Sequence, residues 1–283
     1  MTYLWYFTQM KSGNINYLSE YLDELQSQGK YTFLQSEAIA QLNISTVAYQ
    51  KAVYRLTKKN RLVRIKPNFY VIVPVEYRSL GCLPASWFVD DLMQHLNASY
   101  YVGLLTAAAM YGAGHQQPNV FQIVTDKIIR PITKGALKID FIYAKSLIKM
   151  PVTKMKTATG YMNVSTPEAT AYDLVKYLSA AAQINNVATV LTELSEKLDA
   201  TKLLEIARSD AIAISVIQRL GYLLDYLNSG INTDELAKLA NGKNYYKYIP
   251  LVAAQKGEMH KKIIYARNAR WKIIINEKIE PDL

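Results

Sequence analysis

The sequence predicts an α+β fold in which an N-terminal winged helix-turn-helix precedes a larger mixed α/β second domain. The first observation is the order of elements within the first 80 residues, where three helical patterns are followed by two β-rich runs. The second is the mixture of strand-like and helix-like segments in the rest of the chain. The third is size, because 283 residues, half of them hydrophobic, are enough to bury two cores. We therefore expect one domain over residues 1–80 and a second over residues 81–283.

The first two helices are predicted from apolar spacing and from helix-ending residues. Apolar residues recur at spacings of three and four over residues 17–25, and Gly29 then provides a stop. Ser36 can cap a short helix at Glu37–Leu42, and Asn43 is suited to end it. This pair of elements forms the first part of a helix-turn-helix.

The third helix has the clearest boundaries. Ser45 is predicted to cap a helix that runs to about Lys59, and Asn60 is suited to the left-handed conformation that follows a helix. One stripe of this helix is apolar at spacings of three, four and seven and should pack inward; it consists of Tyr49, Ala52, Val53 and Leu56.

A two-stranded ribbon is expected directly after this helix. The runs Leu62–Lys66 and Phe69–Val75 are rich in β-branched and aromatic residues. Between them, Pro67 and Asn68 have the chemistry of a turn, and asparagine tolerates a positive φ. The ribbon completes the order of a winged helix.

The second domain is predicted only at the level of its elements. We expect helices at Phe88–Leu96 and Tyr101–Tyr111, strands at Val120–Thr125, Leu137–Ala144 and Tyr161–Val164, and a tail strand at Trp271–Ile275. Thr166, Pro167 and Glu168 give a capping residue, a first-turn proline and a first-turn acid for another helix. The topology that joins these elements stays open.

Charge indicates the partner of the first domain. The chain carries a net charge of +10, with a pI near 9.3, and residues 38–75 contain no Asp or Glu. A surface that faces DNA gains from released counterions, whereas a carboxylate there is repelled. A solvated basic face, or a winged helix that contacts protein, remains the alternative.

Position on the winged helix assigns roles to the polar residues. The N-terminal part of a recognition helix meets base edges, which indicates Ser45, Thr46 and Gln50 as base-reading candidates. The phosphate-contacting candidates lie further along the helix and on the wing; they are Lys51, Arg55, Lys58, Lys59, Arg61, Arg64, Lys66 and Asn68.

Bulk properties restrict the other functions. Cys82 is the only cysteine and the three histidines have no ligand spacing, so we expect no metal and no cofactor. No signal peptide is recognised, and the weakly polar stretch at residues 100–114 is too short to span a membrane. These features predict a cytoplasmic protein with no membrane contact.

Five segments of the chain resemble the AbiEi-type antitoxins, the antitoxin halves of bacterial type IV abortive-infection toxin–antitoxin pairs. The segments are Lys51–Ile65, Phe69–Val71, Tyr100–Gly112, Val120–Thr125 and Ser165–Leu174. One departure is visible, because the family often has glycine at the wing turn where this chain has Asn68. The resemblance implies a DNA-binding autorepressor of its own operon, with a second domain that counters a nucleotidyltransferase-like toxin.

Two other functions stay open from the sequence. One is a DNA-processing enzyme, such as a nuclease component targeted by the winged helix, with Asp140 on a predicted strand as its candidate carboxylate. No acid-x-Lys pair follows Asp140, and no GxSxG motif is present, so we expect no enzyme activity. The other is an adaptor that binds a protein through the second domain.

Overall fold

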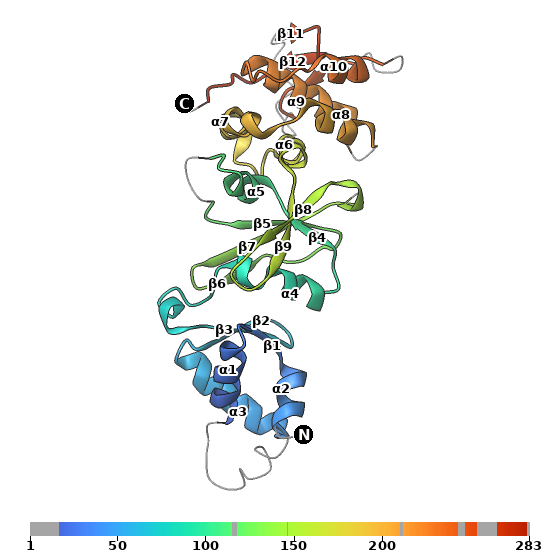
Figure 1. The fold of residues 1–283 in the computed structure, drawn as a ribbon. Helices are drawn as coiled ribbons and strands as arrows, with labels where there is room; N and C mark the ends of the chain where they lie inside the picture. The colour runs from blue at the N-terminus through green and yellow to red at the C-terminus, as the bar shows by residue number, and fades with distance from the viewer. Residues whose placement is uncertain are drawn as a thin grey trace. The chain divides into compact units, whose positions relative to one another are not determined.

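The chain forms two compact units (Figure 1). The computed structural model describes residues 17–114, 118–145, 147–209, 212–242, 247–253 and 265–281. Unit 1 reaches His95 and takes in Ile132–Leu137 and Thr157–Gly160, and unit 2 holds the rest. Unit 1 therefore extends beyond the boundary expected at residue 80. The predicted α+β class is confirmed.

Unit 1 contains the expected winged helix. Its helices are α1 (Tyr17–Ser27), α2 (Gln35–Leu42) and α3 (Thr46–Lys58), and its strands are β1 (Thr32–Leu34), β2 (Leu62–Lys66) and β3 (Phe69–Ile72). The strands form an antiparallel sheet in the order β1-β3-β2. Figure 1 shows the three helices packed on one side of this sheet. The unit continues with the 3-10 helices η2 (Val75–Tyr77) and η3 (Ala85–Trp87), helix α4 (Val89–His95) and strand β6 (Ile132–Lys134).

A small core fixes the helices of unit 1. Leu18 and Leu22 of α1 are fully buried, as is Tyr49 of α3. Phe33 of β1 stacks on Tyr70 of β3, with ring centroids 5.5 Å apart. Aromatic stacking of this kind adds to the hydrophobic stabilisation and sets the position of β1.

Two local predictions for unit 1 were wrong. The short helix begins at Gln35 rather than Glu37, and Ser36 lies inside it instead of capping it. The Ser36 amide is satisfied from a distant part of the chain, by donating to Oδ1 of Asn68 at 3.0 Å. Strand β3 ends at Ile72 because Pro74, which has no amide hydrogen, leads into η2.

Unit 2 is built on a mixed sheet. Its strands are β4 (Tyr100–Val102), β5 (Phe121–Thr125), β7 (Leu137–Tyr143), β8 (Val152–Lys156) and β9 (Tyr161–Ser165), in the order β7-β5-β4-β9-β8. The β5–β7 and β4–β9 pairs are parallel, and the β4–β5 and β8–β9 pairs are antiparallel.

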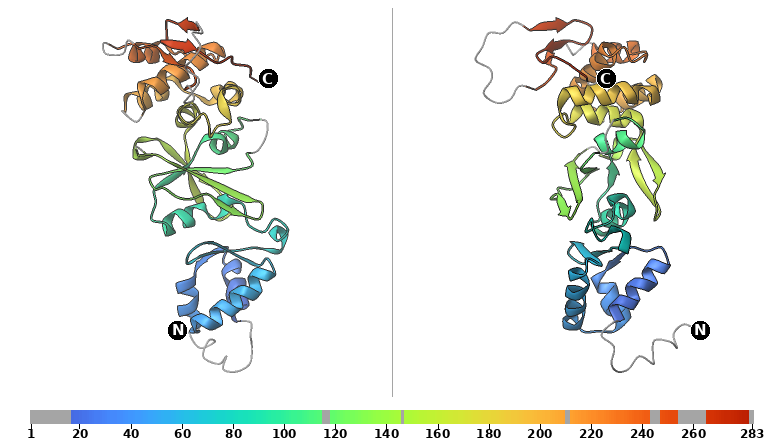
Figure 2. Two further views of the ribbon diagram at one scale, coloured as in Figure 1. Left: turned by 180° about the vertical axis from the view of Figure 1, so that it is seen from behind. Right: turned by 90° about the vertical axis from the view of Figure 1, so that its left-hand side faces the viewer.

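Helices cover this sheet and build the rest of unit 2 (Figure 2). They are α5 (Leu104–Met110), α6 (Pro167–Lys176), α7 (Gln183–Leu194), α8 (Ala200–Arg208), α9 (Ile214–Tyr226) and α10 (Asp234–Ala240), with 3-10 turns η4 (Leu147–Lys149) and η5 (Ser195–Lys197). A second small sheet has the order β10-β12-β11 and consists of β10 (Ile249–Pro250), β12 (Ile273–Ile275) and β11 (Ala266–Asn268). No described helix has both the length and the apolar character needed to cross a membrane.

The predicted helix at Tyr101–Tyr111 proved to be two elements. Its first residues form β4, and α5 begins only at Leu104. The break falls at Gly103, where a Cβ would lie 2.9 Å from the Val124 side chain. In contrast, the helix predicted at Thr166 is confirmed, because the Thr166 side chain accepts the Ala169 amide as an N-cap.

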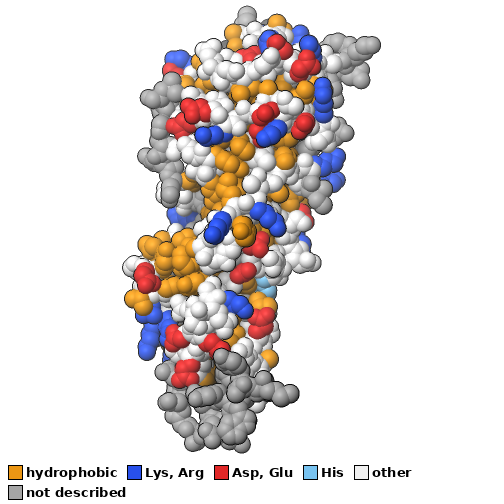
Figure 3. All heavy atoms as spheres, in the orientation of Figure 1, with side chains coloured by type: hydrophobic (Ala, Val, Ile, Leu, Met, Phe, Trp, Pro, Cys, Tyr) orange, Lys and Arg blue, Asp and Glu red, His pale blue; other side chains and the backbone are white. Residues whose placement is uncertain are grey.

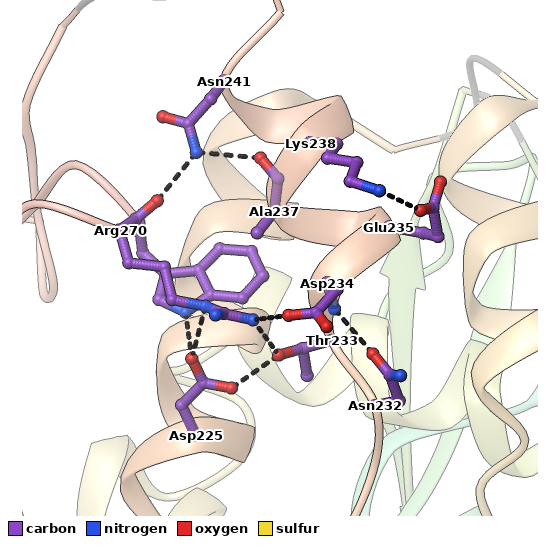
Figure 4. A network of polar contacts seen from close by, with 10 residues as sticks. Asp225, Asn232, Thr233, Asp234, Glu235, Ala237, Lys238, Asn241 and Arg270 are labelled. Carbon is purple, nitrogen blue, oxygen red and sulfur yellow. Dashed lines mark hydrogen bonds and ion pairs between the residues drawn. The ribbon is translucent and has the colours of Figure 1, made fainter.

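A polar network secures the C-terminal hairpin of unit 2 (Figure 4). Trp271 is fully buried, and its Nε1 donates to Oδ2 of Asp225 on α9 at 2.6 Å. Arg270 pairs with Asp225 at 3.0 Å and with Asp234 at the start of α10 at 2.8 Å. One tryptophan and one arginine therefore join the hairpin to two helices.

Candidate nucleic-acid interface

Helix α3 is held at both ends by local hydrogen bonds, as the sequence predicted. The Ser45 hydroxyl accepts the Ala48 amide at 3.2 Å, so Ser45 is the N-cap. Asn60 adopts a φ of 49° just beyond the helix. Because both ends are fixed, each side chain of α3 has a defined direction.

The inward face of α3 also follows the prediction. Tyr49, Ala52 and Leu56 are buried in the core of unit 1, and Val53 packs against it. At about 100° per residue, the opposite side of the helix is centred on Val47, Lys51, Tyr54 and Lys58.

The outward face of α3 contains two apolar residues that the sequence analysis did not single out as site residues. Val47 and Tyr54 are each 61% exposed, and they lie on one face of the helix with Gln50 and Lys51. The Lys58 ammonium lies 4.9 Å from the centroid of the Tyr54 ring, which is a cation–π contact. The signal that identifies both residues is the helical period, since they lie opposite the buried stripe.

The cations of this face are not neutralised within the part of the chain that the structure describes. Lys51, Arg55 and Lys59 are exposed, and none of them is in an ion pair with another described residue. Figure 3 shows Lys and Arg side chains gathered at one edge of unit 1. The face is therefore cationic and available to a polyanion.

Arg61 differs from the other predicted phosphate contacts. Its guanidinium donates to the Ser19 hydroxyl and forms an ion pair with Asp23, both on α1, and its side chain is only 17% exposed. The charge of Arg61 is thus compensated inside unit 1, where it joins α1 to β2.

The turn between β2 and β3 is held from two sides. Asn68 has a φ of 64°, as its place in a wing turn requires, and its side-chain amide donates to the Ser36 hydroxyl at 3.3 Å. On the other side, the Pro67 carbonyl lies 3.0 Å from Nε2 of His95 on α4. Of the two cations predicted on the wing, Arg64 is exposed and Lys66 is half-buried.

The candidate carboxylate for catalysis lies on the surface of unit 2. Asp140 is exposed on β7, and among the described residues no three His, Cys, Asp or Glu side chains gather closely enough to hold a metal ion. Cys82 is buried, and burial raises the pKa of its thiol to about 12, which leaves it a poor nucleophile.

Two family models match the chain over the segments that build these units. The model of the AbiEi antitoxin C-terminal domain matches residues 101–226, and the model described as a transcriptional regulator, AbiEi antitoxin, matches residues 20–73. The chain belongs to the AbiEi antitoxin family. In this AbiEi protein the regulator domain spans α1 to β3, and the antitoxin domain extends from the sheet of unit 2 to the end of α9.

The fold of the AbiEi chain is similar to that of a solved structure. The RV2827C protein from Mycobacterium tuberculosis matches with a TM-score of 0.61 at 14% sequence identity, over 93% of this chain and 92% of that chain. No curated protein matches the sequence. The similarity supports the fold, and the family models supply the regulator and antitoxin class.

Proposed function

We propose that this protein is a transcriptional autorepressor that binds the operator of its own operon through α3. The observation that carries the proposal is the uncompensated cationic face of α3, which lies inside the segment matched by the regulator model. A duplex presents dense phosphate charge, and cations without internal partners gain most from displacing its counterions.

The residues of α3 have two different roles in the proposed binding. Lys51, Arg55, Lys58 and Lys59, with Arg64 on the wing, contact phosphates and position the protein. Gln50 faces outward one turn into the helix, where its amide can pair with adenine in the major groove, and Ser45 and Thr46 lie at the exposed N-terminus. Lys66 and Asn68 are further candidate contacts at the wing, whereas Arg61 pairs with Asp23 of α1.

The test is the salt dependence of duplex binding by the full chain. Binding of the promoter fragment of its own operon is followed by fluorescence anisotropy over a range of salt concentrations. Arg55→Ala and Lys58→Ala each remove one cation from the phosphates, so each should weaken binding to all sequences alike and flatten the slope of log K against log salt by about 0.9. Arg208→Ala, which removes an exposed arginine from α8, is the matched control. An unchanged slope in both α3 variants, or no binding at low salt, contradicts the proposal.

We also propose that the protein is the antitoxin of a type IV pair and acts in the cytoplasm against a nucleotidyltransferase-like toxin. The match of unit 2 to the antitoxin domain supports this. The test is co-expression with a candidate nucleotidyltransferase-like toxin and measurement of growth. The Arg55→Ala, Lys58→Ala double variant should lose repression of a promoter fusion and still protect growth, because the changes lie in unit 1. Failure of the unaltered chain to protect growth contradicts the antitoxin role.

We propose that neither unit is catalytic, since the two matched family models describe a regulator domain and an antitoxin domain. Incubation of supercoiled plasmid with the protein and Mg²⁺ tests this directly. Cleavage that Asp140→Asn abolishes would establish the enzyme instead. Capture of a protein partner that persists after nuclease treatment, without sequence-specific DNA binding, would favour the adaptor.

A further inference from the structure

The centre of the outward face of α3 is apolar at two positions. Val47 and Tyr54 are seven residues apart and each exposes 61% of its surface. Lysines surround them on the same face, with Lys51 between them and Lys58 over the Tyr54 ring. An apolar centre with a cationic border suits a partner that is itself a polyanion with apolar groups inside a groove.

The major groove of DNA offers one apolar substituent, the C5-methyl group of thymine. Val47 is the second residue of α3, so it lies in the N-terminal turn that meets base edges in a recognition helix. Gln50 follows one turn later on the same exposed side and has the geometry to pair with the N6 and N7 atoms of adenine. Neighbouring side chains of the helix thus match the two bases of A·T pairs.

Tyr54 has a different part in this arrangement. Seven residues of helix advance about 10 Å from Val47, which is about three base-pair steps. The exposed Lys58 ammonium lies 4.9 Å from the centroid of the Tyr54 ring, and this cation–π contact favours its position over the aromatic surface. On a bound duplex, Tyr54 would therefore direct Lys58 toward a phosphate beyond the bases next to Val47 and Gln50.

We propose that Val47 is a specificity-determining residue that reads a thymine methyl group, next to an adenine read by Gln50. The inference rests on the proposed DNA binding and adds to it the class of base pair that the operator must contain. A purely apolar protein partner is disfavoured, because Lys51, Arg55 and Lys58 would lose hydration in such an interface without gaining a counter-charge.

The experiment compares thymine with uracil in the same duplex. The full chain first selects a duplex from a pool of random sequences, and the selected duplex is then made with either thymine or deoxyuridine. Deoxyuridine pairs with adenine in the same way and lacks only the methyl group. The thymine form should bind about fourfold more tightly for each methyl group contacted, which corresponds to about 0.8 kcal/mol for one buried methyl-sized group. Single replacements then locate the thymine.

Variants assign the effect to Val47. Val47→Ala should bring the thymine-to-uracil ratio to about one while the slope against salt stays unchanged, and alanine is a better helix former than valine, so α3 is retained. Val75→Ala is the matched control, because Val75 is 68% exposed in unit 1 outside α3 and should leave the ratio unchanged.

The outcomes separate this inference from the proposed function. Salt-dependent binding with equal affinity for both duplexes overturns methyl reading and leaves DNA binding intact. A preference for thymine that survives Val47→Ala overturns the role of Val47. Absence of duplex binding in dilute buffer overturns the proposed function and, with it, this inference.

Discussion

Replacing Gly221 by alanine should destabilise unit 2. Gly221 lies on α9 directly under the Trp271 ring, and a Cβ there would be 2.1 Å from Cη2, 2.2 Å from Cζ3 and 2.5 Å from Cζ2. Carbon atoms pack best at about 3.5–4.0 Å, so the indole must move by about 1.5 Å. This movement would break or stretch hydrogen bonds, because the Trp271 Nε1 donates to Asp225 and the Trp271 carbonyl accepts from Gln218 at 3.0 Å.

The size of the effect follows from three contributions. Overpacking costs about 1–3 kcal/mol, and a buried indole N–H that loses its acceptor costs about 1–3 kcal/mol. Alanine is favoured over glycine in a helix by about 1 kcal/mol, which offsets part of this. The free energy of unfolding should therefore fall by about 1–5 kcal/mol.

Urea denaturation followed by far-UV circular dichroism measures this change. With a slope of about 1–3 kcal/mol per molar urea, a loss of about 3 kcal/mol moves the midpoint by about 1 M or more. Gly242→Ala is the matched control, since a Cβ there meets only the Leu239 carbonyl at 3.4 Å. In a Trp271→Leu background, Gly221→Ala should change the free energy of unfolding little, because the indole that the new Cβ meets is gone. A Gly221→Ala chain as stable as the unaltered one would refute the packing argument.

Three further predictions concern polar residues. Burial raises the pKa of Asp173 to about 7, although Tyr101 donates a hydrogen bond to its carboxylate at 2.8 Å. The folded chain therefore binds this proton more tightly than the unfolded chain, and the free energy of unfolding falls as pH rises from about 4 to 7. Across that window, the free energy of unfolding of Asp173→Asn should rise relative to that of the unaltered chain by up to about 1.4 kcal/mol per pH unit. Urea denaturation at several pH values measures this difference, and parallel stability–pH profiles of the two chains would contradict it. Arg61→Ala should lower the thermal stability of unit 1, because Asp23 loses its partner, yet leave the salt slope of DNA binding unchanged; a flatter slope would place Arg61 at the duplex. Asn68→Ala should cost about 1–2 kcal/mol in thermal unfolding and Asn68→Gly less, because φ is 64°; equal losses would exclude backbone strain.

The parts of the fold that depend on local chemistry were predictable from sequence. The cap at Ser45, the left-handed residue Asn60 and the inward stripe of α3 depend on residues close in the chain, and the structure has all of them. Strand β2 was expected at Leu62–Lys66 and has those bounds. The start of the helix after Thr166 also depends only on residues close in the chain.

The parts that depend on distant partners were not predictable. Strand β1 has three residues, a pattern too short to recognise, and it exists because β3 pairs with it. Tyr100–Val102 is a strand rather than the start of a helix because β5 and β9 lie on either side of it. The ion pair of Arg61 with Asp23 joins residues 38 positions apart, so charge counting alone could not show that this charge is compensated within unit 1.

The anchored tip of the β2–β3 hairpin has a consequence for the DNA complex proposed above. The tip is bonded to α2 through Asn68 and to α4 through Pro67, so it is not a free loop that could extend along a duplex. Recognition should then come from one side of the double helix. In the proposed complex, a small molecule bound in the minor groove should therefore leave binding of the protein to the same stretch of DNA unchanged.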